Sequence, residues 1–285
     1  MKTNRLYIPI LALALAAGFT SCDDFLDREP MSTVDPEVYF TQVSQLESYA
    51  NQLYENILPS HGNWSYGIFG EDSGTDNQTG ATANNRFAEG LWKVPNKDDD
   101  NWKFEWIYRC NFFLQNVLEK YGTKEDGSEN TIMGDLASIK HYIGEIYFLR
   151  AYEYFKRYQK YGDFPIITEP LADDMEILRE SNKRMPRTEV ARFILDDLKK
   201  AYDFLSAKEM ATTRINKDAA LLLRSRVALF EGTWLKSFEG TAFVPNGEGW
   251  PGASKDYNKD YQFKSGSIDK EINYFLEQAI ADAET

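Results

Sequence analysis

The chain has 285 residues and a formal charge of −13, with 45 acidic side chains against 32 basic ones. Nucleic acid and anionic lipid surfaces both repel so acidic a protein, so neither is an expected partner. The chain is long enough to bury a substantial core, and its two cysteines exclude a disulfide-rich scaffold.

Residues 1–21 have the features of a secretory signal peptide, because Lys2 and Arg5 precede a short apolar run that ends in small polar residues. The run is shorter than the roughly 20 apolar residues of a membrane span. Cys22 follows at once, and the sequence FTSC has the form of a relaxed lipobox. Two interpretations remain open: an ordinary signal peptide, or a lipoprotein acylated at Cys22. We favour the lipoprotein, which leaves Cys110 as a free thiol that packs in the core.

The mature chain begins with an extended tether over 22–35, and helical periodicity then continues through the domain 36–285. Apolar residues recur at helical spacing, which predicts a mainly α fold with few strands. The predicted helices cover 43–57, 106–121, 136–158, 190–205, 217–230 and 268–280. We expect Thr188, Asn216 and Ser267 to cap the last three helices, Gly162 to end the third, and a Gly- and Pro-rich loop over 240–266. Recurring helix pairs suggest tetratricopeptide-like stacking.

The segment 59–101 loses all periodicity and is far longer than an ordinary connection, which is typical of functional loops. Sugar recognition uses flat aromatic faces together with carboxylate, amide and guanidinium groups for the hydroxyls. The loop supplies both kinds of group outside any periodic element. We expect ligand contacts from Trp64, Tyr66, Asp72, Asp76, Asn77, Arg86 and Trp92. The alternative is that these side chains only pack against the helices, above all Trp92.

The chain carries few features of an enzyme. It has two histidines, His61 and His141, and none of the common zinc, nucleophile-elbow or phosphate-binding motifs. We therefore predict no catalytic residue, no metal site and no cofactor. A glycosidase carboxylate pair stays possible, because sequence does not show the distance between two acids. The acidic run 98–100 lacks the spacing of a calcium loop and is better explained as solvated surface.

One charged and aromatic cluster has both a functional and a structural interpretation. Arg150, Tyr154 and Tyr158 share one face of the predicted helix 136–158. An arginine beside tyrosines could hold a ligand, but on a long helix it also pairs with a carboxylate while the tyrosines pack. We favour the structural interpretation.

Several segments in order resemble the SusD/RagB family of surface lipoproteins. The strongest is LRAYEYFKRYQKYGDFPII (149–167), and SCDDFLDREP (21–30) resembles the family tether. The other segments are EWIYRCNFFLQNV (105–117), MPRTEVARFILDDLKKA (185–201) and TRINKDAALLLRSRVALFEG (213–232). Family members are nearly twice as long, so the carboxyl-terminal half of the domain is expected to be missing. The apolar face of helix 268–280 would then lack a partner to bury it.

The resemblance implies a binding protein without chemistry of its own. Members are anchored in the outer membrane by lipid, face the cell exterior and act as lids on a SusC-like TonB-dependent transporter. They capture glycans or, in the RagB branch, peptides. Glycan capture is the leading hypothesis, with peptide capture and a non-binding helical scaffold as alternatives. Neighbouring transporter and glycosidase genes would distinguish them, while the sequence names neither the ligand nor its length.

Overall fold

The computed structural model describes residues 39–59, 89, 102–124, 126–207 and 213–285. Within these ranges the chain is helical and contains no strand, so the mainly α class is confirmed. All the helices of the described residues lie in the compact unit Phe40–Thr285. They are α3 (Val43–Ile57), α4 (Glu105–Tyr121), α5 (Leu136–Tyr161), α6 (Met175–Ser181), α7 (Arg187–Phe204), α8 (Lys217–Ser237), the 3₁₀ turn η4 (Pro251–Ser254) and α9 (Ile268–Glu284).

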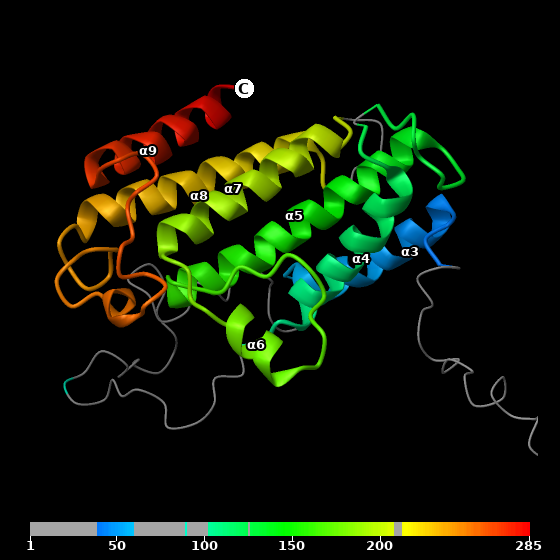
Figure 1. Ribbon diagram of the computed structural model, residues 1–285. Helices are drawn as coiled ribbons and strands as arrows, with labels where there is room; N and C mark the ends of the chain where they lie inside the picture. The colour runs from blue at the N-terminus through cyan, green and yellow to red at the C-terminus, as the bar shows by residue number, and fades with distance from the viewer. Residues whose placement is uncertain (1–38, 60–88, 90–101, 125, 208–212) are drawn as a thin grey trace, which may run out of the picture. The chain divides into compact units, whose positions relative to one another are not determined.

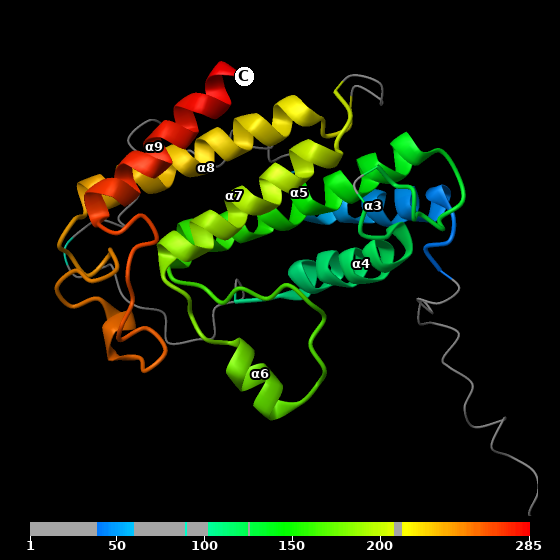
Figure 2. The same cartoon turned by 45° about the horizontal axis from the view of Figure 1, so that its top comes forward.

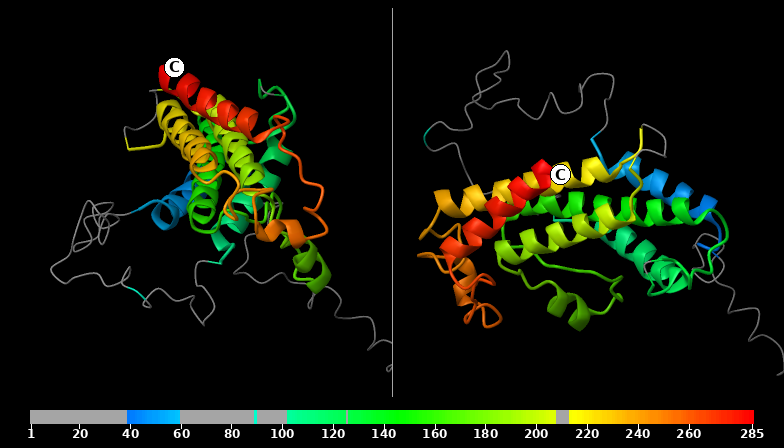
Figure 3. Two further views of the ribbon diagram at one scale, coloured as in Figure 1. Left: turned by 90° about the vertical axis from the view of Figure 1, so that its left-hand side faces the viewer. Right: turned by 90° about the horizontal axis from the view of Figure 1, so that it is seen from above.

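Helices α5, α7, α8 and α9 lie side by side and alternate in direction (Figure 1). Gly144 near the start of α5 touches Leu205 just beyond α7, and Gly232 near the end of α8 touches Leu276 of α9. A side chain at either glycine would collide with the neighbouring helix, so both permit close approach of two backbones. Figure 2 and Figure 3 show the same order from other sides, with α3 and α4 against α5. This arrangement is consistent with tetratricopeptide-like helix pairs.

Two of the three predicted caps are confirmed. The side chains of Asn216 and Ser267 accept hydrogen bonds from the backbone N–H groups of Ala219 and Lys270. The Thr188 cap is wrong, because α7 begins one residue earlier and the buried Thr188 hydroxyl instead contacts the hydroxyl of Tyr261. A carboxylate from elsewhere in the fold accepts from the first N–H of α7, so no local cap is needed at this end.

The expected lack of a partner for the last helix is also wrong. Ile272, Phe275 and Ala279 of α9 are buried, and α9 packs along α8. Only Ile280 of the predicted face is largely exposed.

Cys110 is fully buried as a free thiol, as predicted, and burial raises the pKa of this thiol.

Buried arginine–carboxylate pairs join helices that are distant in sequence. Arg150 of α5 donates two hydrogen bonds to Asp197 of α7, at 2.7 and 2.8 Å, and a third to Asn111 of α4. Arg214, just before α8, holds Glu145 of α5 in the same way. These contacts confirm the structural interpretation of Arg150, because its guanidinium is enclosed among side chains of three helices.

We expect Arg150→Leu to lower the free energy of unfolding by about 3–5 kcal/mol, since it leaves the fully buried Asp197 without its partner. Urea unfolding of the full chain, followed by circular dichroism, measures this loss. The control is Lys199→Ala, which breaks an exposed pair with Asp203 on the same helix α7 and should cost less than about 1 kcal/mol. Equal losses of unfolding free energy in the two variants would contradict the structural role of Arg150.

Candidate functional site

Every ligand-contact residue predicted from the sequence lies outside the described residues. This holds for Trp64, Tyr66, Asp72, Asp76, Asn77, Arg86 and Trp92. The lipid-anchor position Cys22 and the acidic run 98–100 also lie there. These predictions therefore remain predictions, and the site below is built from other residues.

A large hollow of the described structure lies where several helices end together. The end of α5, the start of α7, the end of α8 and the loop 240–266 meet at one end of the helix layer (Figure 1). The hollow has a volume of about 640 Å³ and we call it the aromatic hollow. It is lined by Gln159, Lys160, Tyr161, Gly162, Asp163, Arg184, Arg187, Trp234, Ala242, Phe243, Trp250, Pro251, Gly252, Lys255, Tyr257 and Asn258.

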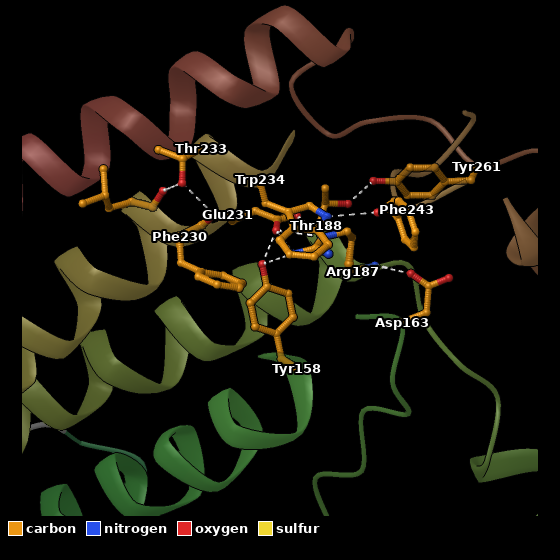
Figure 4. Close-up of polar contacts among 11 residues, drawn as sticks. Tyr158, Asp163, Arg187, Thr188, Phe230, Glu231, Thr233, Trp234, Phe243 and Tyr261 are labelled. Atoms are coloured by element: carbon orange, nitrogen blue, oxygen red, sulfur yellow. Dashed lines mark hydrogen bonds and ion pairs between the residues drawn. The ribbon is translucent and has the colours of Figure 1, made fainter. Parts of the chain in front are cut away.

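A buried ionic cluster supports the floor of the hollow (Figure 4). Arg187 donates from Nε and Nη2 to Glu231 of α8, both at distances of 2.8–2.9 Å. Nη2 also donates to the hydroxyl of Tyr158 at 2.9 Å, and that hydroxyl contacts Glu231 in turn. The guanidinium lies 4.3 Å from the centre of the Trp234 ring, which completes a cation–π contact. One arginine thus connects α5, α7 and α8 and positions an aromatic wall.

Asp163 fastens the loop 240–266 to the rim of the hollow. It follows Gly162, whose φ of 67° ends α5 in the left-handed region that glycine adopts freely. One carboxylate oxygen of Asp163 accepts from the backbone N–H of Arg187 and the other from Nε1 of Trp250, both at 2.8 Å. Burial raises the pKa of Asp163, and these two hydrogen bonds oppose the rise. Gly162 therefore ends the helix α5, and Asp163 holds the loop 240–266 in place.

The remaining walls are aromatic side chains of the loop and of α8. Trp250 is buried against Gly252, where a Cβ atom would lie 2.1 Å from the indole ring, so only glycine fits. Phe243 and Tyr257 are 62% and 41% exposed and present their rings toward solvent. Flat aromatic faces of this kind bind the CH groups of sugar rings, while the polar groups beside them can bind hydroxyls.

A second, smaller hollow of about 350 Å³ lies between the start of α4, the segment 167–171 and α6. Its lining is mainly apolar and includes Trp102, Phe104, Tyr108 and Leu178. It offers few polar groups for a hydroxyl-rich ligand, so the aromatic hollow is the better candidate.

The described ranges contain no cluster of three or more His, Cys, Asp or Glu side chains that could hold a metal ion. In the same part of the chain, no helix has both the length and the apolar character that crossing a membrane requires.

Sequence reasoning missed the aromatic hollow, because its lining comes from segments up to 99 residues apart, Gln159 to Asn258. The loop 240–266 was recognised only as Gly- and Pro-rich. Its sequence AFVPNGEGWPG does carry a signal, since two large aromatic residues stand among turn-forming residues in a long connection.

With this geometry described, the comparisons with known proteins identify the family. Residues 24–229 match the family SusD-like_3, which is described as "Starch-binding associating with outer membrane". This match covers most of the chain, and the chain therefore belongs to the SusD-like family, a family of carbohydrate-binding proteins. The resemblance drawn from the sequence is confirmed.

Individual relatives agree with this assignment. SusD-like protein P25 of Formosa agariphila is 26% identical over 234 residues, which are 75% of this chain and 41% of P25. SusD-like protein P2 of the same organism is 25% identical over 258 residues, covering 87% of this chain and 47% of P2. A SusD-like carbohydrate-binding protein of Bacteroides fragilis has a similar fold, with a TM-score of 0.50 and 17% identity over 70% of this chain and 40% of that one. The chain thus spans less than half the length of these relatives.

The cluster at the floor of the hollow predicts a loss of stability at alkaline pH. Burial raises the pKa of Tyr158 well above its usual value of 10.0, and Glu231 adds to the rise while Arg187 opposes it. The unfolded chain therefore loses this proton first. The contribution of the buried, neutral Tyr158 to the free energy of unfolding is fully present below pH about 10. Above that pH it declines by up to about 1.4 kcal/mol per pH unit.

The measurement compares urea unfolding of the wild type and Tyr158→Phe across this range of pH. The difference in free energy of unfolding between the two proteins should be constant below pH about 10. Above that pH the wild type should lose stability relative to Tyr158→Phe. A difference that stays constant through pH 11 would contradict the buried, neutral state of Tyr158.

Proposed function

We propose that this protein captures glycans at the cell surface and delivers them to a SusC-like TonB-dependent transporter of the outer membrane. The observation that carries the proposal is a hollow with aromatic walls and polar groups in a chain of a carbohydrate-binding family. The relatives that the chain matches are longer, so their further segments are expected to contribute to capture as well.

The binding surface that we propose has two parts. In the hollow, the exposed rings of Phe243 and Tyr257 stack on sugar faces, while the side-chain amide of Asn258 forms hydrogen bonds with sugar hydroxyls. In the segment 59–101, Trp64 and Tyr66 stack on sugars in the same way, and Trp92 is a third aromatic contact. Hydroxyl groups there bind to Asp72, Asp76, Asn77 and Arg86.

We also propose that the protein binds its ligand without cleaving it. Glycoside hydrolysis by the usual route needs two carboxyl groups on either side of the bond. Among the described residues that line the hollow, Asp163 is the only carboxylate, and both its oxygens already accept hydrogen bonds from the protein. A group held in this way serves the loop and is poorly placed to transfer a proton to a sugar.

The proposed anchor is a lipid on Cys22, which would hold the protein on the outer membrane facing the cell exterior. We expect Cys22→Ser to abolish acyl labelling and to release the protein from membranes, because several acyl chains contribute about 0.8 kcal/mol for each buried CH₂ group. The wild type, purified from detergent-extracted outer membranes, should bring a TonB-dependent transporter with it. A Cys22→Ser protein that still fractionates with membranes lacking the transporter would rule out this anchor.

Glycan binding is tested by calorimetry on the full-length lipoprotein in detergent with a panel of oligosaccharides. Phe243→Ala and Tyr257→Ala in the hollow, and Trp64→Ala, Tyr66→Ala and Arg86→Ala in the loop, should each weaken binding. The expected loss for an aromatic platform is about 1–3 kcal/mol, the range for burying a large apolar side chain.

Tyr108→Ala is the matched control, since Tyr108 is 47% exposed and borders the other, apolar hollow. It should bind like the wild type. Tyr154→Ala is the control for folding, because Tyr154 is fully buried and should affect stability but not the affinity of molecules that fold. If Tyr108→Ala alone weakens binding, the ligand occupies the apolar hollow and the proposed site is wrong.

A further inference from the structure

The charge lining the aromatic hollow is opposite in sign to that of the protein. The chain as a whole is acidic, with a formal charge of −13. The described lining nevertheless includes four basic side chains, Lys160, Arg184, Arg187 and Lys255, of which Arg187 is paired with Glu231, and the single acid Asp163. A cleft lined by one sign of charge concentrates ligands of the opposite sign. The hydroxyls of a neutral sugar need hydrogen-bond donors but no net positive charge, so the excess of cations needs an explanation.

Arg187 offers an unused donor at the floor of the hollow. Its Nε and Nη2 atoms are occupied by Glu231 and Tyr158, and its residue is only 3% exposed. Nη1 donates no hydrogen bond to the part of the chain that the structure describes. A Cβ atom on residue 162 would lie 3.6 Å from Nη1, so the glycine at this position leaves the donor uncovered. A nearly buried guanidinium with a free N–H edge is a strong donor to an anion.

Two further cations at the rim form no close ion pair with a carboxylate within the described residues, although Arg184 lies near enough to Asp163 to oppose the rise in the pKa of that carboxyl. The guanidinium of Arg184 stacks on the ring of Trp102 at 4.5 Å and forms no ion pair there, and neither does Lys255. Other cations of the same surface are neutralised, since Lys183 pairs with Glu180 and Lys264 pairs with Glu189. Arg184 and Lys255 therefore keep their charge available to a ligand at the rim of the hollow.

We propose that the aromatic hollow selects anionic glycans, whose sugars carry uronate carboxylates or sulfate esters. The sugar ring lies against Phe243 or Tyr257, while its anionic group accepts hydrogen bonds from Arg187 Nη1 and attracts Arg184 and Lys255. This inference rests on the proposed function, glycan capture, and adds the chemical class of the ligand. Carboxylates and sulfates share the chemistry that the hollow recognises, because both present several acceptor oxygens around a negative charge.

The experiment uses the full-length lipoprotein in detergent and pairs of probes that differ only in charge. One pair is an oligogalacturonate and its methyl ester, and the other is a sulfated galactan oligosaccharide and its desulfated form. An oligoglutamate peptide serves as an anion that is not a sugar. We expect each anionic sugar to bind about tenfold more tightly than its neutral counterpart, and high salt to reduce this preference.

The double variant Arg184→Gln/Lys255→Gln should lower the affinity for the anionic sugars about fivefold and leave the neutral sugars unaffected. The matched control is Lys199→Gln, which neutralises one exposed cation on α7 outside the hollow and should change neither affinity. A higher affinity for the sulfated sugar than for the oligogalacturonate, or the reverse, identifies which anionic group the hollow recognises.

Each other outcome overturns a distinct part of the inference. Equal binding of the anionic and neutral sugars overturns the preference for charge but leaves glycan capture standing. Binding of oligoglutamate as tightly as oligogalacturonate shows that the hollow recognises anionic peptide, which overturns the assignment to a glycan. Failure to bind any sugar of either pair, together with failure across the wider oligosaccharide panel, overturns the proposed function itself.

Discussion

The ion pair between Arg187 and Glu231 is the interaction on which this end of the molecule depends. Both side chains are almost completely buried, and removing two charges from water has a large free-energy cost that only good geometry offsets. Here the geometry is good, since two nitrogens of Arg187 bind the carboxylate and the hydroxyl of Tyr158 joins both partners. Such a pair contributes less to net stability than to choosing one arrangement of α5, α7 and α8 over others.

Arg187 also links the helix layer to the hollow. Its backbone N–H binds Asp163, which in turn holds the indole of Trp250, so α5, α7 and the loop 240–266 share one chain of hydrogen bonds. Its aromatic contact with Trp234 fixes a second wall. Because these connections run through buried or half-buried groups, they restrain the two walls formed by Trp234 and Trp250. Pre-ordered walls reduce the entropy lost when a sugar binds.

The sequence predicts the helices well and the hollow poorly, for a physical reason. Apolar periodicity and the caps Asn216 and Ser267 depend on residues a few positions apart, so they are visible in one dimension. Thr188 was a plausible cap by composition, but Asp163, 24 residues before Arg187 in sequence, accepts from the first N–H of the helix instead. Helix α6 was not predicted because its seven residues are too few for an apolar pattern to repeat at helical spacing. The hollow depends wholly on such distant contacts, and the predicted loop residues 64–92 lie outside the described structure.

The close packing of Trp250 on Gly252 divides the loop 240–266 into two kinds of position. Packing constrains the residue types at Trp250 and Gly252, because any larger residue at 252 would displace the indole from Asp163. Phe243, Lys255 and Tyr257 project from the same loop and are exposed, so their replacement disturbs little of the packing beneath. Related proteins could therefore exchange these outer side chains one at a time and acquire new ligand preferences, while the frame that presents them is inherited unchanged.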